Sequence, residues 1–235
     1  MPHTFAAYED LLRRVNRDAI QLWSVIESEF IEATSAFDSE YRAGGRDQGW
    51  YKAKARYFND LIVSLLSNAT GKPMATRRKK RSQLFEKLDI DVCYPDADPP
   101  VVGAEVKMVG TPPHPGNNQK GRPASQDMHK RIREVAFTSI DFKVAYSPPR
   151  PIGSFQNWID SCDPGYFSFW AMRLENEADF TRVRTALVNL RTYCNGVGTI
   201  FYEARSDAQP TNYVVRKVDE LNIDRNLREM AQRVS

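Results

Sequence analysis

Two carboxylates and a lysine stand close together in the chain, within apolar segments that alternate like strands. Asp91 lies in the stretch 89–94, and Glu105 and Lys107 lie in the stretch 101–108. Side chains of a strand alternate between its two faces, so Glu105 and Lys107 share one face. The proline-rich connection favours a turn, and the two strands are expected to pair as a hairpin. Three polar groups would then meet at one spot.

The chemistry that fits this cluster is metal-dependent hydrolysis of a phosphodiester. Carboxylate oxygens suit the hard cation Mg²⁺, which needs only one or two protein carboxylates when a phosphate supplies other ligands. Asp91 and Glu105 are the expected ligands. The ion would polarise a phosphoryl oxygen and lower the pKa of a bound water, while Lys107 would orient that water and offset transition-state charge.

The pattern resembles the PD-(D/E)xK nuclease superfamily, and within it the type II restriction endonucleases. The family motif has an acid on one strand, followed on the next strand by an acid, any residue and Lys. Asp91 matches the first acid, with Asp89 as the alternative, and Glu105 and Lys107 match the rest. The family often adds a carboxylate from a helix ahead of the hairpin, and Asp60 stands at that position.

The resemblance implies an α/β (α+β) fold with a restriction-endonuclease-like core, in which helices flank a mixed central β-sheet. It also implies a Mg²⁺-dependent, site-specific endonuclease that cuts double-stranded DNA and works as a homodimer on a palindrome. A DNA repair nuclease or junction resolvase of the same superfamily would use the same residues and stays open. A non-catalytic DNA-binding module is the alternative from another class.

The segments around the motif are expected to supply the rest of that core. Apolar residues between Ala55 and Leu65 lie on one helix face, and the strand expected before Asp89 has only 84–87 available. A helix should follow over 128–136, and alternation over 140–146 predicts a strand. That strand would carry Asp141-Phe142-Lys143, the one rival triplet, which lacks an acid-bearing strand before it.

The remaining segments are expected to be scaffold. Apolar intervals of three and four from Leu11 to Phe37 predict one long N-terminal helix, which would cover the sheet or pair with its symmetry mate. Further on, the sequence predicts strands at 166–174, 199–204 and 213–218 and helices at 180–190 and 223–234. The chain 1–235 is expected to form a single domain, with 1–45 as a helical extension, 50–147 as the catalytic core and 148–235 completing it.

Basic residues gather on both sides of the motif, although 33 basic and 30 acidic residues leave a net charge of only +3. The stretch 71–83 contains no acid, and 107–133 contains one. Such segments suit a surface that neutralises DNA phosphates, and the loop 117–122 carries side chains that can read base edges. The predicted DNA contacts are Arg77, Arg78, Lys79, Lys80, Arg81, Asn117, Asn118, Gln119, Lys120, Arg122, Lys130, Arg131 and Arg133.

Other chemistries are disfavoured by spacing. The three cysteines, Cys93, Cys162 and Cys194, are too scattered for a zinc site and suggest reduced thiols in the cytoplasm. Gly71-Lys72 is followed by proline instead of the Ser or Thr of a phosphate-binding loop. No apolar stretch approaches the roughly 20 residues of a membrane span, so no membrane partner is expected.

Overall fold

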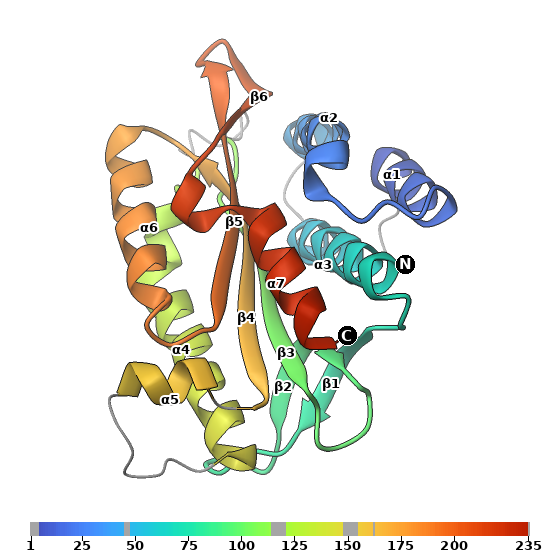
Figure 1. The fold of residues 1–235 in the computed structure, drawn as a ribbon. Helices are drawn as coiled ribbons and strands as arrows, with labels where there is room; N and C mark the ends of the chain where they lie inside the picture. Colours follow the sequence, from blue (N-terminus) through green and yellow to red (C-terminus); the bar gives the residue numbers. More distant parts are fainter. Residues whose placement is uncertain (1–4, 45–47, 114–120, 148–154, 162, 235) are drawn as a thin grey trace.

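The structure, a computed structural model, describes residues 5–44, 48–113, 121–147, 155–161 and 163–234 (Figure 1). These residues form an α+β fold with one mixed sheet covered by helices, as expected. The strands are β1 (Ala75–Lys80), β2 (Leu88–Tyr94), β3 (Val102–Val109), β4 (Gly165–Leu174), β5 (Gly196–Ser206) and β6 (Gln209–Arg216). The helices are α1 (Ala6–Arg17), α2 (Trp23–Gly44), α3 (Gln48–Thr70), α4 (Met128–Tyr146), α5 (Phe155–Ser161), α6 (Glu177–Leu190) and α7 (Ile223–Val234), with short 3-10 turns at Ala124–Asp127 and Asp219–Leu221.

The strands lie in the sheet in their chain order, from β1 to β6. β1, β2 and β3 pair antiparallel, β3, β4 and β5 pair parallel, and β6 returns antiparallel to β5. Parallel neighbours need crossover connections, and helices α4 to α6 supply them. Every residue of β4 is buried, which is typical of a strand covered on both faces.

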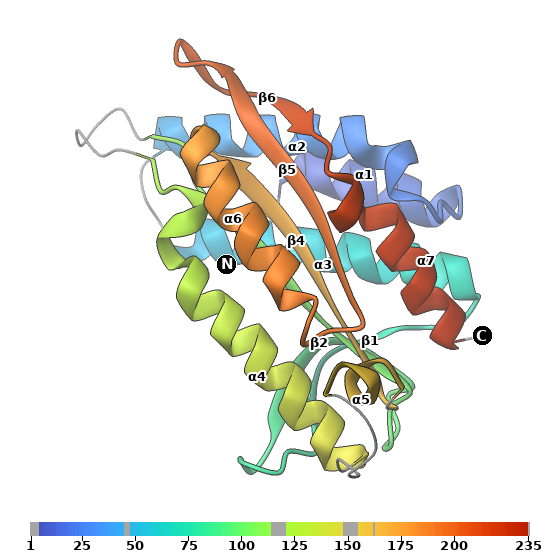
Figure 2. The ribbon, with the colours of Figure 1, turned by 60° about the vertical axis from the view of Figure 1, so that its left-hand side comes forward.

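Each face of the sheet has its own apolar core. α3 and α7 pack on one face and α4 and α6 on the other (Figures 1 and 2). Alternation along β4 divides its side chains, so that Phe169 belongs to the first core and its neighbour Trp170 to the second. The hairpin that carries the motif is therefore fixed between two packed layers.

A buried ion pair ties the N-terminal helices to the far edge of the sheet. The ammonium of Lys54, on α3, donates to both carboxylate oxygens of Asp38, on α2, at 2.8 Å each. The hydroxyl of Tyr213, on β6, donates to the same carboxylate at 2.7 Å. All three side chains are buried.

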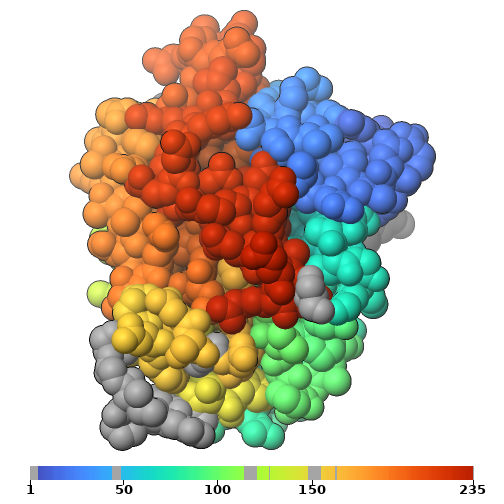
Figure 3. Space-filling model, in the orientation of Figure 1, coloured from blue at the N-terminus to red at the C-terminus, as the bar shows by residue number. Residues whose placement is uncertain are grey.

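The prediction of one long N-terminal helix is wrong. The chain forms α1 and α2 instead, with a turn after Arg17 in which Ala19 has a φ of +48°. The side-chain amide of Asn68 donates to the carbonyls of Val15 and Ile20 and so stabilises that turn. The turn lets both helices pack with α3, and α1 and α2 form one block beside it (Figure 3). Apolar periodicity continues across the turn because both helices bury the same kind of face.

Two further expectations next to the motif are corrected. The strand before β2 is not 84–87, which lies in bends, but Ala75–Lys80, so the basic run forms an edge strand. Residues 140–146 continue helix α4 instead of forming a strand. Val135, Ser139 and Phe142 keep helical spacing on its buried side, and no Gly or Pro interrupts the helix.

The expected elements beyond residue 165 are confirmed as β4, α6, β5, β6 and α7. β4 to β6 extend the sheet that β1 to β3 begin. Among the described helices, none combines the length and apolar character needed to cross a membrane.

Candidate functional site

The site lies where β2 and β3 part. They pair from Tyr94↔Val102 to Val92↔Ala104, after which β2 continues along β1 while β3 pairs with β4. The carboxylate of Asp91 accepts a hydrogen bond of 2.9 Å from the backbone N–H of Val106, across the start of the gap. This side chain thus replaces a ladder bond and is fixed at the opening.

The three predicted residues are brought together at this opening. The ammonium of Lys107 donates to Oε1 of Glu105, and it lies 3.7 Å from Oδ2 of Asp91. Asp89, the alternative acid, lies two residues along β2 and is exposed. The contact with Lys107 favours Asp91 as the first acid of the motif.

Glu105 is nearly enclosed, with 12% of its side chain exposed. The hydroxyl of Tyr166, on β4, donates to its Oε2 at 3.0 Å. Burial raises the pKa of Glu105 and the nearby charge of Asp91 adds to the rise, while the ammonium of Lys107 opposes it. Burial and the charge of Glu105 raise the pKa of Tyr166 well above its usual range, so this phenol stays a donor.

Lys107 is held as an ammonium ion. Burial lowers its pKa, but the charges of Glu105 and Asp91 outweigh burial, so the pKa lies above its ordinary value. At neutral pH this side chain therefore donates hydrogen bonds and supplies positive charge rather than taking up a proton.

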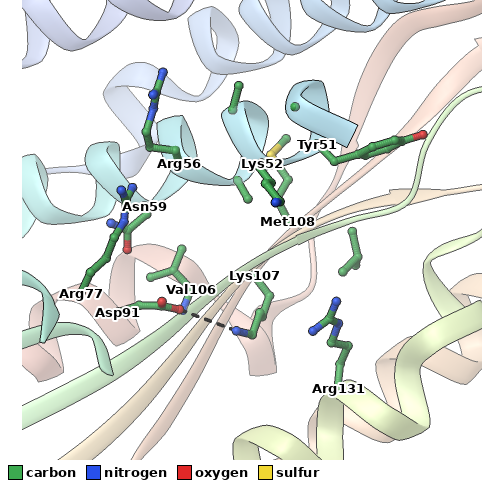
Figure 4. Close-up of a pocket in the computed structure, with 14 residues that line it drawn as sticks. Tyr51, Lys52, Arg56, Asn59, Arg77, Asp91, Val106, Lys107, Met108 and Arg131 are labelled. Carbon is green, nitrogen blue, oxygen red and sulfur yellow. Dashed lines mark hydrogen bonds and ion pairs between the residues drawn. The ribbon is translucent and has the colours of Figure 1, made fainter. Parts of the chain in front are cut away.

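A cleft of about 770 Å³ opens above Asp91 and Lys107, bounded by α3, β1, β3 and α4 (Figure 4). Its wall carries several cationic side chains, namely Lys52, Arg56, Arg77 and Arg131. Arg131 also pairs with Glu134 at 3.0 Å. The lining of the cleft therefore combines the carboxylate of Asp91 with several basic side chains.

Arg77 reaches this cleft from an irregular point of β1. The pairs Thr76↔Val92 and Arg78↔Ile90 place Arg77 opposite Asp91. The φ of Arg77 is +51°, in a region of backbone conformation that residues other than glycine rarely adopt. Strained backbone of this kind concentrates at functional sites. Its guanidinium lies 3.8 Å from the carboxylate of Asp60.

The rest of the first basic run is divided by the alternation of β1. Arg78 pairs with Asp96 at 2.8 Å, and Arg81 lies 3.8 Å from Asp98. Lys80 is buried and donates to the carbonyls of Asp96 and Ala97, so its ammonium is turned away from solvent. Lys79 is exposed.

The second basic stretch is described only in part. Asn117, Asn118, Gln119 and Lys120 lie outside the described residues. Arg122 is exposed, and its backbone pairs with Thr111. On α4, Lys130 and Arg133 are exposed, and Arg131 lines the cleft.

Of the two adjacent residues on α3, Asn59 lines the cleft, whereas Asp60 is not among the described residues that line it. Asp60 is turned towards Arg77; burial raises its pKa, and Arg77 and the neighbouring Asn59 amide partly oppose the rise. Sequence reasoning missed Asn59 and also Tyr166. A polar residue within a buried stretch of helix was the only available signal for Asn59, and the pairing of β3 with β4 gives Tyr166 no local signal.

The rival triplet has a structural place on α4. The carboxylate of Asp141 accepts hydrogen bonds from the hydroxyl of Ser82 at 2.5 Å and the backbone N–H of Gln83 at 2.8 Å. The ammonium of Lys143 donates to the carbonyl of Ile159 at 2.9 Å. Both side chains are buried, and neither lines the cleft.

No set of three or more His, Cys, Asp and Glu side chains is arranged to hold a metal ion in the described part of the chain. Asp91 and Glu105 are the two carboxylates that Lys107 contacts.

Comparisons of the chain with protein-family models, with curated proteins and with solved structures found no match.

Proposed function

We propose that the protein is a Mg²⁺-dependent endonuclease that hydrolyses double-stranded DNA, of the PD-(D/E)xK type and most similar in role to type II restriction enzymes. One observation carries the proposal. Asp91 and Lys107 line a cleft with basic walls at the point where two antiparallel strands part. Glu105 is not among the residues that line the cleft, but its carboxylate pairs with Lys107 directly beside it. The resemblance implies a helix, strands, a helix and a further strand, and α3, β1 to β3, α4 and β4 follow one another in that way, with the short helix α5 between α4 and β4. The last strand of this series is β4 and not the expected 140–146.

The residues present fit a hard divalent cation. The two carboxylates share a partly enclosed spot, and each already contacts the ammonium of Lys107, so positive charge is favoured there. The charge of Asp91 contributes to the raised pKa of Glu105, and a cation between them would relieve that repulsion. Two carboxylates suffice for Mg²⁺ when water and phosphate complete its shell. Asp91 and Glu105 would hold the ion, which supplies Lewis-acid polarisation of the phosphoryl group and a more acidic water.

The protein groups around the carboxylates have distinct roles. Tyr166 holds the orientation of Glu105, as groups behind metal ligands commonly do. Lys107 donates a hydrogen bond to the attacking water and offsets the charge that develops on the phosphate. The basic wall of the cleft attracts and holds the DNA backbone, because neutralising phosphates releases their counterions.

The partner and the assembly belong to the same proposal. Arg77 and Arg131 in the cleft and the exposed cations Lys79, Lys130 and Arg133 are the described residues offered for duplex contact. A two-fold dimer would place two such sites on the two strands of a palindrome. A cytoplasmic location, where DNA is the substrate, completes the proposal.

The test is digestion of phage and plasmid DNA by the purified protein, in Mg²⁺ and in EDTA, beside Glu105→Gln. Discrete fragments that require both Mg²⁺ and Glu105 are the expected result, and their ends give the target sequence. A smear that requires both would indicate a repair or nonspecific nuclease of the same chemistry. Retained DNA binding without cutting would contradict the enzymatic proposal and leave the binding module.

A further inference from the structure

Asn59 buries an amide without giving it a partner. Asn59 is 5% exposed, and neither Oδ1 nor Nδ2 has a partner in hydrogen-bond geometry among the described residues. The carboxyl group of the neighbouring Asp60 lies close enough for the amide to lower its pKa, but it lies outside that geometry. Asn68, nine residues along the same helix, instead donates to two backbone carbonyls at 3.1 and 2.9 Å. Burying an unpaired amide is unfavourable, so an unsatisfied group of this kind points to a ligand or a water.

This amide belongs to the cleft that opens above the motif. Asn59 lines it together with Asp91 and Arg77, and Figure 4 shows Asn59 and Arg77 beside each other on the same side of Asp91. Asn59 comes from α3 and Arg77 from β1, so two separate elements direct N–H donors into one space.

Arg77 lines the same space from β1. Its φ of +51° is strained, and the contact of 3.8 Å with Asp60 is too long for a hydrogen bond. A guanidinium and a carboxamide together present N–H donors in planar groups, which suit the oxygens of a phosphate. The carboxylate of Asp91, on the opposite side, would repel a free anion, so a phosphate here requires a cation at Asp91.

We propose that Asn59 and Arg77 form a subsite that binds a non-bridging oxygen of the DNA phosphodiester next to the cleaved bond. The inference rests on the proposed function, because a DNA substrate supplies this phosphate. Arg77 contributes charge. Asn59 is neutral and enclosed, and it sets the position of the oxygen relative to Asp91. Asn59 is thus a substrate-binding residue of the site, distinct from the metal ligands.

The first test uses two matched variants of α3, Asn59→Leu and Asn68→Leu. Asn59→Leu removes a buried amide and keeps the number and branching of the side-chain heavy atoms, so the thermal midpoint should not fall, while kcat should fall roughly a hundredfold. KM should change little, because many other phosphates hold the duplex. Asn68→Leu should do the reverse, lowering the thermal midpoint and leaving kcat unchanged. Wild-type kcat in Asn59→Leu would overturn the subsite.

The second test does not depend on cleavage. The side-chain amide resonances of ¹⁵N-labelled protein are followed while a short DNA duplex is added in Mg²⁺, in a Lys107→Ala background that prevents cutting. The pair of signals assigned to Asn59 by its loss in Asn59→Leu should shift. If these signals stay in place at saturating duplex, Asn59 holds only water and the subsite is wrong. If the Asn59 signals shift but the wild-type protein cuts no DNA, the phosphate-binding role of Asn59 stands and the proposed nuclease activity is wrong.

Discussion

The hydroxyl of Tyr166 on β4 donates a hydrogen bond of 3.0 Å to Oε2 of Glu105 on the adjoining β3. The other oxygen, Oε1, accepts from the ammonium of Lys107. Tyr166, from the neighbouring parallel strand, therefore binds one oxygen of the Glu105 carboxylate, and Lys107, two residues further along β3, binds the other. The two contacts hold the carboxylate of Glu105 in one orientation, as the role of metal ligand proposed for it requires.

Removing the contact from Tyr166 should weaken metal binding without unfolding the protein. Tyr166→Phe keeps the buried ring and loses only the donor, so the affinity for Mg²⁺ should fall about tenfold. Titration calorimetry with MgCl₂ measures it. Tyr202→Phe is the matched control, because the buried hydroxyl of Tyr202 has no partner within the described residues and its loss should not change the affinity. Equal affinities in all three proteins would reject the role given to Tyr166.

As the pH is lowered, the protein should lose its affinity for Mg²⁺ at a higher pH than it would if Glu105 had the pKa of an ordinary glutamate. Protons compete with Mg²⁺ for a carboxylate, and burial raises the pKa of Glu105 above its ordinary 4.5. The affinity is therefore full above the raised pKa and is lost as the pH falls through it. Tyr166→Phe should move the midpoint to still higher pH, because the lost hydrogen bond stabilised the charged form. A midpoint at or below pH 4.5 in the wild type would contradict the enclosed site.

Two basic residues of the same strand should behave differently. Arg77→Gly removes the guanidinium, and glycine adopts the positive φ at this position without strain. DNA binding should therefore weaken for every sequence. The slope of the logarithm of the binding constant against the logarithm of the salt concentration should fall in magnitude by about 0.9. Lys80→Met instead removes a buried ammonium that donates to the carbonyls of Asp96 and Ala97, so it should lower stability by about 1–3 kcal/mol and leave the salt slope unchanged. Binding measured over a salt series and urea unfolding separate the two. A lowered slope in Lys80→Met would mean that the strand contacts DNA as a unit.

The ion pair between α2 and α3 should matter for stability only. Lys54→Met leaves the carboxylate of Asp38 buried without its cation, so unfolding in urea should show a loss of about 3 kcal/mol. The double variant Asp38→Leu with Lys54→Met removes both charges and should be more stable than the single variant. Cleavage per folded molecule should match the wild type in both. A single variant as stable as the wild type would show that the pair is replaceable by solvent.

The hairpin and its three polar residues could be predicted because all the necessary signals are local. Alternation over two short strands, a proline-rich turn and the spacing of Glu105 and Lys107 lie within about twenty residues. The elements beyond residue 165 followed equally regular patterns. The mixed sheet flanked by helices was predicted through the resemblance, and the structure agrees with it.

The errors arose where a local pattern fitted two structures. Apolar intervals run through the turn at Ala19, so periodicity could not locate the break between α1 and α2. The run Arg77 to Arg81 is so polar that its strand is visible only from its pairing with β2. Residues 140–146 alternate like a strand, but their burial follows α4. Which of Asn59 and Asp60 faces the cleft depends on the rotation of α3 against β3, a tertiary property.

The most direct test of the account compares Lys107→Met with Lys217→Met, an exposed lysine far along the chain from the motif. Cleavage of plasmid DNA in Mg²⁺ is measured together with gel-shift binding of the same DNA in EDTA. Lys107→Met should lose cleavage, while its affinity for DNA stays within about twofold of the wild type. The reason is that the ammonium of Lys107 stabilises the transition state, whereas many other contacts hold the phosphates of the DNA. Lys217→Met should retain both. Cleavage that survives in Lys107→Met would contradict the assignment of the site.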